Sequence, residues 1–282
     1  MKVKAFAKIN LFLEITGKRP DGYHNLVSIM QEISLYDELL IKKKKEKKIS
    51  VRITGGYKTP LGKNNIVYKS ADLMFRKYNI NEGIDIRLKK NIPIGAGLGG
   101  GSSNAAAVIK AINRLWKLGL DKKALINIGK KIGADVPFFI HGGTCRVKGI
   151  GEKITVLPEI KKWWILLIYP NINISTKEIY DRYSFTLTKF IKRCSILKFS
   201  NTANGSLRFK DFLFNRLEEP AFTLEPKLKK IKENLACFPS QGALMTGSGS
   251  CIYAILESKR TAFMLKKSLN VKDLSIWVLE TK

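Results

Sequence analysis

Cysteine and histidine are scarce in this sequence of 282 residues, which has four of the first and two of the second. The cysteines are widely spaced and form no CxxC pair: Cys145, Cys194, Cys237 and Cys251. Such spacing suits neither a disulfide framework nor a structural zinc site. We therefore expect isolated, reduced cysteines of the kind that cytoplasmic proteins carry.

Long apolar runs are also missing. No stretch of about 18 uninterrupted apolar residues occurs, so no membrane-spanning helix is expected. Lysines interrupt the segment Met1–Lys8, which lacks the apolar centre and the small-residue cleavage site of a signal peptide. We expect a cytoplasmic protein that has no membrane partner.

Acidic residues are few, since 23 Asp and Glu stand against 51 Lys and Arg, for a net charge of +28. A nucleic-acid-binding protein would gather such charge, with aromatic side chains, on one surface. Here the lysines are spread along the whole chain, and the run at Lys42–Lys45 is expected at a solvated hairpin or an exposed sheet edge. The charge suits anionic small molecules such as nucleotides, and no nucleic-acid partner is expected.

The first third of the chain has the pattern of strands. Residues 6–15 and 84–88 alternate polar and apolar side chains at period two, and a further extended segment covers residues 39–51. This part of the chain therefore predicts a sheet.

Helices follow the glycine-rich segment that comes next. Residues 103–118 carry an apolar stripe at helical spacing, with Ser102 or Ser103 as the expected cap, and residues 122–133 form a second, short helix. Glycines between residues 142 and 151 then mark a domain boundary, which gives domains 1–150 and 151–282.

The second half alternates apolar runs with amphipathic segments. The expected elements are a strand at 163–169, helices at 215–222 and 226–235, a strand at 251–256, a helix at 260–269 and a strand at 274–279. This order predicts an α+β domain built on an antiparallel sheet.

The strongest motif is Pro93–Ser103, with the sequence PIGAGLGGGSS, which leads directly into a helix. Glycines let successive backbone N–H groups turn toward a ligand, and a helix N-terminus favours an anion. The segment therefore predicts a phosphate-binding loop. It is not a Walker loop, because Gly101 is followed by two serines where lysine is needed. Its GxGxxG pattern, with Asp121 further on, leaves a dinucleotide-dependent oxidoreductase as an alternative.

Two further motifs have both a structural and a chemical interpretation. In Gly133–Phe139, the sequence GADVPFF, Asp135 either caps a helix that begins at Val136 or serves as a general base in an apolar setting. In Met245–Cys251, the loop TGSGS is either a tight hairpin or a second glycine-rich part of a site.

The motifs in combination resemble the GHMP kinases, which include galactokinase, homoserine kinase and mevalonate kinase. The resemblance rests on AKINL at residues 7–11 and on the three motifs above, which occur in order along the chain. The segment from Thr16 to Leu26, TGKRPDGYHNL, is similar to that of the members that act on a cytidine diphosphate-linked polyol in isoprenoid precursor synthesis. Another small-molecule kinase of the same family is the alternative within it.

This resemblance implies a two-domain α+β fold. The N-terminal domain would be similar to the second domain of a ribosomal small-subunit protein, the C-terminal domain would be ferredoxin-like, and the active site would lie between them. ATP and Mg²⁺ are the implied cofactors, the substrates are small molecules, and the protein is expected as a monomer or a weak homodimer.

The resemblance also implies roles for particular residues. Asp135 would take the proton of the substrate hydroxyl, and Lys8 would keep that carboxylate ionised. The implied ATP-binding residues are Asn65, Lys90, Pro93, Gly95, Gly97, Leu98, Gly99, Gly100, Gly101, Ser102 and Ser103. Ser103 is also a candidate Mg²⁺ ligand, and the other metal ligands stay open.

On the substrate side, Tyr23 and Tyr180 would sandwich the cytosine ring while His24 reads its edge. The implied substrate-binding residues are Asn10, Tyr23, His24, Asp135, Thr176, Tyr180, Gly247 and Ser248. The chain departs from the family pattern at two places: Lys177 stands where proline is usual, and Arg216 interrupts the usual Asn-Asp-Leu-Glu.

Overall fold

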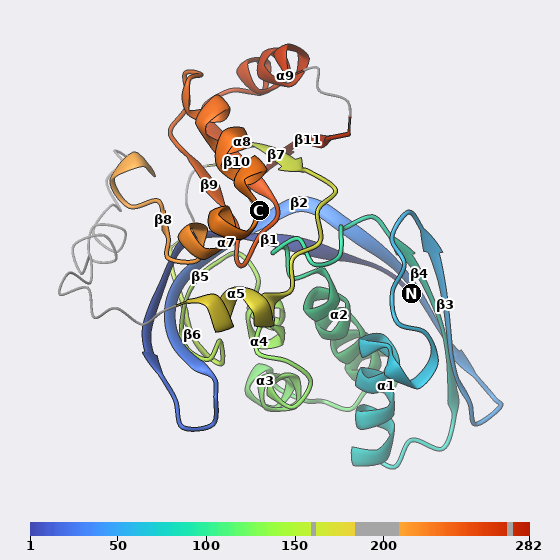
Figure 1. Ribbon diagram of the computed structural model, residues 1–282. Coiled ribbons are helices and arrows are strands. Elements are labelled where there is room, and N and C mark those ends of the chain that lie inside the picture. The colour runs from blue at the N-terminus through green and yellow to red at the C-terminus, as the bar shows by residue number, and fades with distance from the viewer. Residues whose placement is uncertain (159–161, 184–208, 270–272) are drawn as a thin grey trace. The chain divides into compact units, whose positions relative to one another are not determined.

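The computed structural model describes residues 1–158, 162–183, 209–269 and 273–282 (Figure 1). The chain divides into two compact units. Unit 1 consists of Met1–Lys8, Leu35–Ile94 and Gly99–Gly142, and unit 2 of Ile9–Ser34, Gly95–Leu98 and Gly143–Lys282. The units interleave along the sequence, and the domain boundary near residue 150 stays a prediction. Cys194 lies outside the described residues.

Two long strands contribute to both units, β1 (Lys2–Lys18) and β2 (His24–Lys44). The other elements of unit 1 are β3 (Ile49–Gly55), η1 (Gly62–Asn64), α1 (Ile66–Lys77), β4 (Gly83–Lys90), α2 (Gly100–Leu115), α3 (Lys122–Lys130) and α4 (Val136–His141). β4 pairs in parallel with β3 on one side and antiparallel with the second half of β2 on the other. In Figure 1, α1 and α2 lie against each other beside these strands.

The lysine-rich segment does not form a hairpin. The strands on either side of it, β2 and β3, both pair with β4, which lies between them. β3 ends the strand order, but the lysines do not lie on it: Lys42 and Lys43 are near the end of β2, where they pair with β4, and Lys45 follows β2. Lys42, Lys43 and Lys45 are exposed, so the run is solvated at the end of β2.

Two predictions about helices in this unit are wrong. The strand-like first third contains α1, which begins at Asn65, whose side chain accepts a hydrogen bond from the Val67 N–H. The serines do not cap α2, because the helix begins earlier, with Gly99 in a left-handed conformation as its cap. Ser102 and Ser103 therefore lie inside the first turn.

Unit 2 contains a four-stranded sheet in the order β11-β7-β10-β9, in which each pair is antiparallel. Its elements are β5 (Thr144–Gly149), β6 (Lys153–Val156), β7 (Trp164–Tyr169), α5 (Thr176–Arg182), η2 (Phe209–Asp211), β8 (Phe214–Asn215), α7 (Glu218–Leu224), α8 (Pro226–Ala236), β9 (Ala243–Met245), β10 (Ile252–Leu256), α9 (Lys259–Ser268) and β11 (Ser275–Glu280). Helices α8 and α9 pack on this sheet (Figure 1). The predicted antiparallel α+β arrangement is confirmed.

The buried strands of this sheet explain the apolar run at residues 163–169. Ile165, Leu166 and Leu167 are fully buried, as is Tyr253 on the neighbouring strand. Each such side chain contributes about 1.5–3 kcal/mol when it is removed from water. The sheet therefore supplies much of the core of unit 2.

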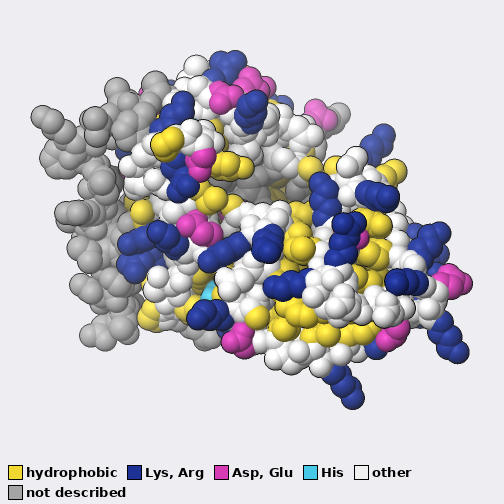
Figure 2. All heavy atoms as spheres, turned by 90° about the horizontal axis from the view of Figure 1, so that it is seen from below, with side chains coloured by type: hydrophobic (Ala, Val, Ile, Leu, Met, Phe, Trp, Pro, Cys, Tyr) yellow, Lys and Arg dark blue, Asp and Glu magenta, His cyan; other side chains and the backbone are white. Residues whose placement is uncertain are grey.

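Figure 2 shows how basic side chains are distributed on one face of the molecule. On that face, Lys and Arg are scattered among apolar and acidic side chains. Cys145 and Cys251 are buried, Cys237 is exposed, and no disulfide links these three. Among the residues that the structure describes, no helix combines the length and the apolar character that a bilayer crossing requires.

Candidate active site

The first turn of α2 has the geometry of an anion-binding helix end. Gly99 precedes it with φ 67°, and no side chain caps the helix. The Ser103 N–H donates to the Gly99 carbonyl at 2.9 Å, which closes the first turn. The N–H groups before it have no acceptor within the helix, and the helix dipole places positive charge there. This turn therefore offers amide donors to a phosphate.

Glycine is required at the start of this turn by close packing. A Cβ built on Gly99 would lie 2.8 Å from the Phe139 ring and 3.3 Å from Lys8 Cγ. On Gly100 it would lie 2.9 Å from a methyl carbon of Ile92 and 3.1 Å from Lys90 Nζ. Real Cβ atoms do not tolerate the shorter contacts, so the backbone approaches its neighbours only because these residues lack side chains.

Lys8 and Asp135 are brought together in unit 1, although 127 positions separate 8 from 135. Lys8 is 4% exposed. Burial lowers the pKa of its ammonium, and attraction to the Asp135 carboxylate acts in the opposite direction. Asp135 is partly exposed and precedes α4, but its side chain makes no capping hydrogen bond. Asp135 therefore occupies the N-cap position expected of it, but its carboxylate is not used as a capping acceptor.

The loop that carries Asp135 also borders the first turn of α2. A Cβ built on Gly133 would lie 3.8 Å from Ser102 Oγ. Because Lys8 packs under Gly99, the base candidate, its ammonium neighbour and the amide donors form one cluster in unit 1. This arrangement can accept a proton beside a phosphate-binding turn.

The two other ATP-binding candidates of unit 1 are engaged within the protein. Asn65 is buried, caps α1 and donates its amide to the Pro60 carbonyl at 2.8 Å. Lys90 is 3% exposed and pairs with Asp37 at 2.7 Å. Burial lowers the pKa of Lys90, while the pairing with Asp37 raises it. No local pattern in the sequence marks a carboxylate on a strand as the partner of a distant lysine, so Asp37 was not among the predicted site residues.

Pro93 and Leu98 of the glycine-rich segment are buried, whereas Gly95 is exposed. In unit 2, the first half of the segment packs against the TGSGS loop. A Cβ on Gly97 would lie 2.0 Å from the Thr246 carbonyl oxygen. The Thr246 hydroxyl donates to the Gly97 carbonyl at 3.2 Å and accepts from the Asn10 N–H at 3.1 Å.

Three predicted motifs therefore meet at one threonine. Asn10 is buried, and its amide donates to Ser28 Oγ at 2.8 Å. Thr246 belongs to the TGSGS motif but was not itself predicted as a site residue. The tight-hairpin interpretation of the loop is also satisfied, since β9 and β10 on its two sides are paired.

The substrate-side candidates of unit 2 form two groups. Thr176 Oγ1 and Ser248 Oγ lie 2.9 Å apart, next to Gly247 in the loop. The rings of His24 and Tyr180 have centroids 5.2 Å apart. Tyr23 is 61% exposed and so presents a free aromatic face. A sandwich of the cytosine ring between Tyr23 and Tyr180 stays a prediction.

The departure at Lys177 fits the local structure. Ser175 caps α5, with the Glu178 N–H at 3.4 Å, so Lys177 is the second residue of the helix. Proline is tolerated in the first turn of a helix because no intrahelical bond needs its N–H. Lysine and proline are therefore both compatible with this position.

The segment around Arg216 holds the TGSGS loop in place. The Asn215 amide donates to the carbonyls of Met245 and Gly247 at 2.7 and 2.8 Å. Glu218 accepts a bond from the Met245 N–H at 2.9 Å. In the sequence this segment is only an imperfect match to the family pattern, and no role was predicted for it.

No metal-binding cluster is formed by the side chains of the described residues, taken as groups of at least three His, Cys, Asp or Glu. Ser103, the candidate Mg²⁺ ligand, is 3% exposed. Mg²⁺ in kinase sites takes many of its ligands from substrate phosphates and water, so a single side-chain donor is compatible with its binding.

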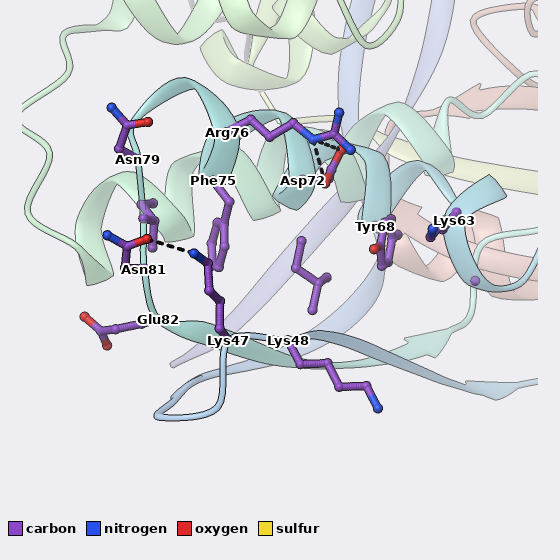
Figure 3. A pocket seen from close by; sticks show the side chains of 13 residues that line it. Lys47, Lys48, Lys63, Tyr68, Asp72, Phe75, Arg76, Asn79, Asn81 and Glu82 are labelled. Carbon is purple, nitrogen blue, oxygen red and sulfur yellow. Dashed lines mark hydrogen bonds and ion pairs between the residues drawn. The ribbon is translucent and has the colours of Figure 1, made fainter.

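A pocket of about 630 Å³ lies elsewhere in unit 1, between α1 and the turn before β3 (Figure 3). Its polar groups are largely paired: Lys47 donates to Asn81 at 3.0 Å, and Arg76 pairs with Asp72 at 3.0 Å. None of the predicted site residues lines it. The site candidates of unit 1 therefore lie around α2 and not in this pocket.

Comparison with known proteins agrees with this geometry. The family model described as GHMP kinases N terminal domain matches residues 65–143, and GHMP kinases C terminal matches residues 201–270. The chain is 39% identical over 281 residues to the 4-diphosphocytidyl-2-C-methyl-D-erythritol kinase of Clostridium kluyveri, with 100% of both chains covered. The chain belongs to the GHMP kinase family.

Further relatives of this GHMP kinase carry the same name. The protein of Alkaliphilus oremlandii is 40% identical over 286 residues, which cover 99% of this chain and 96% of that protein. A crystal structure of a 4-(cytidine 5'-diphospho)-2C-methyl-D-erythritol kinase superposes with a TM-score of 0.78 at 30% identity, covering 100% of this chain and 99% of that one. The predicted GHMP kinase fold is confirmed.

A GHMP kinase uses ATP, so a nucleotide and a small-molecule alcohol are its substrates. The comparisons do not support the oxidoreductase alternative, and the structure gives the physical reason. A dinucleotide-binding fold needs parallel strands around the glycine-rich segment. β5, the strand that follows α4, instead runs antiparallel to its partner β2. Asp121, which would bind a ribose, instead caps α3 by accepting from the Ala124 N–H at 2.7 Å.

Proposed function

We propose that this GHMP kinase transfers the γ-phosphoryl group of ATP to the 2-hydroxyl of 4-diphosphocytidyl-2-C-methyl-D-erythritol, in the synthesis of isoprenoid precursors. Whole-chain relatives with that name support the substrate. The observation that supports the chemistry is the position of the Asp135 carboxylate. It makes no capping hydrogen bond to α4, and it lies beside Lys8 and near the first turn of α2.

In the proposed reaction, the substrate oxygen forms a bond to the γ-phosphorus, and the bond from that phosphorus to the bridging oxygen breaks to release ADP. Asp135 accepts the hydroxyl proton. Lys8 stabilises the carboxylate and the charge that develops on the transferred group. The reaction needs little more than positioning and charge stabilisation, so a small set of side chains suffices.

The residues of α2 fit the phosphates of ATP. Their N–H groups are uncapped, and the glycines admit a close approach of the backbone. Gly95–Leu98 would extend the same loop. The side-chain amide of Asn65 already donates to Thr59 and Pro60, so Asn65 would position that segment rather than bind the nucleotide through its amide. Mg²⁺ would neutralise phosphate charge, with Ser103 as its candidate protein ligand.

For the substrate, Tyr23 offers an exposed ring for stacking and His24 a polar edge for the base. Thr176, Gly247 and Ser248 provide hydroxyl and backbone groups for the polar diphosphate and polyol. The monomeric or weakly dimeric state, the cytoplasmic location and the lack of a nucleic-acid partner are proposals of the same kind.

The test is an ATP-dependent phosphorylation assay with 4-diphosphocytidyl-2-C-methyl-D-erythritol, run beside mevalonate, homoserine and galactose. We expect turnover of the first alone. Asp135→Asn should lower kcat by about 10²–10⁴. Asp121→Asn is the matched control, because asparagine still caps α3 and kcat should not change.

Two results would contradict the proposal. Preferred phosphorylation of another alcohol would remove the substrate assignment while leaving the kinase chemistry. Near-normal turnover by Asp135→Asn would remove Asp135 as the base.

A further inference from the structure

Asp37 is a fully buried carboxylate that the reaction itself does not use. Its side chain is 0% exposed and pairs with the Lys90 ammonium at 2.7 Å. Its Oδ1 accepts the backbone N–H groups of Asn91 and Ile92 at 2.7 and 2.8 Å. Its Oδ2 also accepts the side-chain amide of Asn104 at 2.9 Å. Four donors from two segments of the chain therefore converge on one carboxylate.

These donors link β2 to the start of the phosphate-binding helix. Asn91 and Ile92 follow β4 immediately before the glycine-rich segment, and Asn104 lies one turn into α2, at i+4 from Gly100. Lys90 and Ile92 are the groups against which Gly100 packs. A shift of Asp37 would therefore move the first turn of α2 in two ways. It would displace Lys90 and Ile92, on which Gly100 packs, and it would displace Asn104 in the second turn.

We propose that Asp37 is a positioning residue that fixes the first turn of α2 for the phosphates of the nucleotide. Lys90 acts through Asp37. Its ammonium donates to Asp37 and to the Ile92 carbonyl, and so holds in place the residues on which Gly100 packs. This inference rests on the proposed function only in that the turn binds nucleotide phosphate.

The alternative role for Lys90 is direct contact with ATP, and a charge-neutral double variant separates the two. Asp37→Asn leaves the buried ammonium without its counter-ion, and Lys90→Met leaves the carboxylate without its own. Both single variants should therefore disturb the turn. In Asp37→Asn/Lys90→Met neither charge remains, and Asn104 Oδ1, which has no hydrogen-bond partner, can accept from the new amide after a flip.

The measurement is binding of ATP and of adenosine, by calorimetry and by competition, without the alcohol substrate. In Asp37→Asn we expect ATP affinity to fall at least about tenfold and adenosine affinity to stay within about twofold, because only the phosphate contacts move. The double variant should regain most of the ATP affinity. If the double variant binds ATP as weakly as Lys90→Met, Lys90 contacts ATP directly and the positioning role is wrong.

Asp85→Asn is the matched control. Asp85 is also a buried carboxylate on a strand of unit 1, where it pairs with Arg52 and Arg87. Its substitution should lower the melting temperature without changing the ratio of ATP to adenosine affinity. A change in that ratio as large as that of Asp37→Asn would show a general effect of buried charge and overturn the proposal.

Asn104→Leu keeps the test decisive if Asp37→Asn does not fold. It removes one donor to Asp37 and no charge, so ATP affinity should fall about threefold to tenfold while adenosine affinity is kept. Unchanged ATP affinity in Asn104→Leu would contradict the positioning role, as would a double variant that binds ATP as weakly as Lys90→Met. Failure of the wild-type enzyme to phosphorylate the named alcohol, with normal ATP binding, would contradict only the proposed substrate.

Discussion

Arg216 and Glu14 form a bidentate ion pair in unit 2, with Nε to Oε1 at 2.7 Å and Nη2 to Oε2 at 2.8 Å. Both side chains are largely shielded from solvent, at 18% and 5% exposure. Arg216 follows β8, which pairs in parallel with β1 at Phe12 and Leu13. The arginine that departs from the family pattern is therefore matched by an acidic residue on the adjacent strand.

A charge exchange tests this pairing. Arg216→Asp places two carboxylates together in a shielded site, so we expect a loss of about 3–5 kcal/mol in the free energy of unfolding. Glu14→Arg combined with Arg216→Asp should recover at least half of that loss, as measured by urea denaturation. Additive effects of the two substitutions would show that the pair has no coupling energy.

Gly99→Ala tests the packing under the phosphate-binding turn. The new methyl group would lie 2.8 Å from the Phe139 ring, and Gly99 has φ 67°. We expect at least a tenfold rise in the KM for ATP, because the turn must move away from Phe139. Gly119→Ala is the control. Gly119 has φ 66°, and a Cβ built on it would meet no atom within 4 Å, so only the backbone strain of about 1–2 kcal/mol applies. Equal effects of both substitutions on KM would contradict the packing argument.

The sequence predicted best those helices and strands whose apolar pattern is contained within the element itself. The apolar run at β7 and the stripe of α2 are local features, and both elements were predicted close to their observed bounds. α1 was missed because its polar residues mask its apolar stripe, and because its cap, Asn65, was interpreted only as a nucleotide ligand. An asparagine that caps a helix and one that binds a nucleotide look the same in the local sequence.

Contacts between distant segments could not be predicted from pattern. Asp37 and Lys90 are 53 residues apart, and Asn10 and Thr246 are 236 apart. Family resemblance supplied Lys90 and Asn10 as site residues but not the partners that hold them. Tertiary pairing alone decides those partners, so the structure was needed to find them.

His24 should give substrate binding a pH dependence. Burial, and then the charge of Lys18, lower the pKa of this imidazole from its ordinary value of 6.5, and Asp181 opposes them. His24 therefore takes up its second proton at a lower pH than an ordinary imidazole does, and in doing so it loses its acceptor nitrogen.

We expect the KM for the cytidine substrate to rise about fivefold as the pH falls from about 7.5 to about 5.5, while the KM for ATP stays nearly constant. In His24→Gln this rise should disappear, because glutamine does not titrate. A rise that persists in that variant would assign the titration to another group.

Lys8→Met should separate stability from activity. Lys8 is 4% exposed, and burial is the main cause that lowers the pKa of its ammonium below 10.5. Because the unfolded chain binds this proton more tightly than the folded chain, the ammonium costs stability at neutral pH, and this cost falls as the pH rises toward 10.5. A methionine of similar length avoids that cost, so the variant should be at least as stable as the wild type at pH 7, with the difference narrowing at higher pH.

The same substitution removes a cation from the reacting groups, so kcat should fall by about 10²–10³. Thermal and urea unfolding across pH, together with steady-state kinetics, measure both effects. Lys2→Met, an exposed position on the same strand, should change neither. If Lys8→Met is instead destabilised by more than about 2 kcal/mol, the ammonium supports the fold, and the loss of turnover reflects a displaced Asp135 rather than a missing charge.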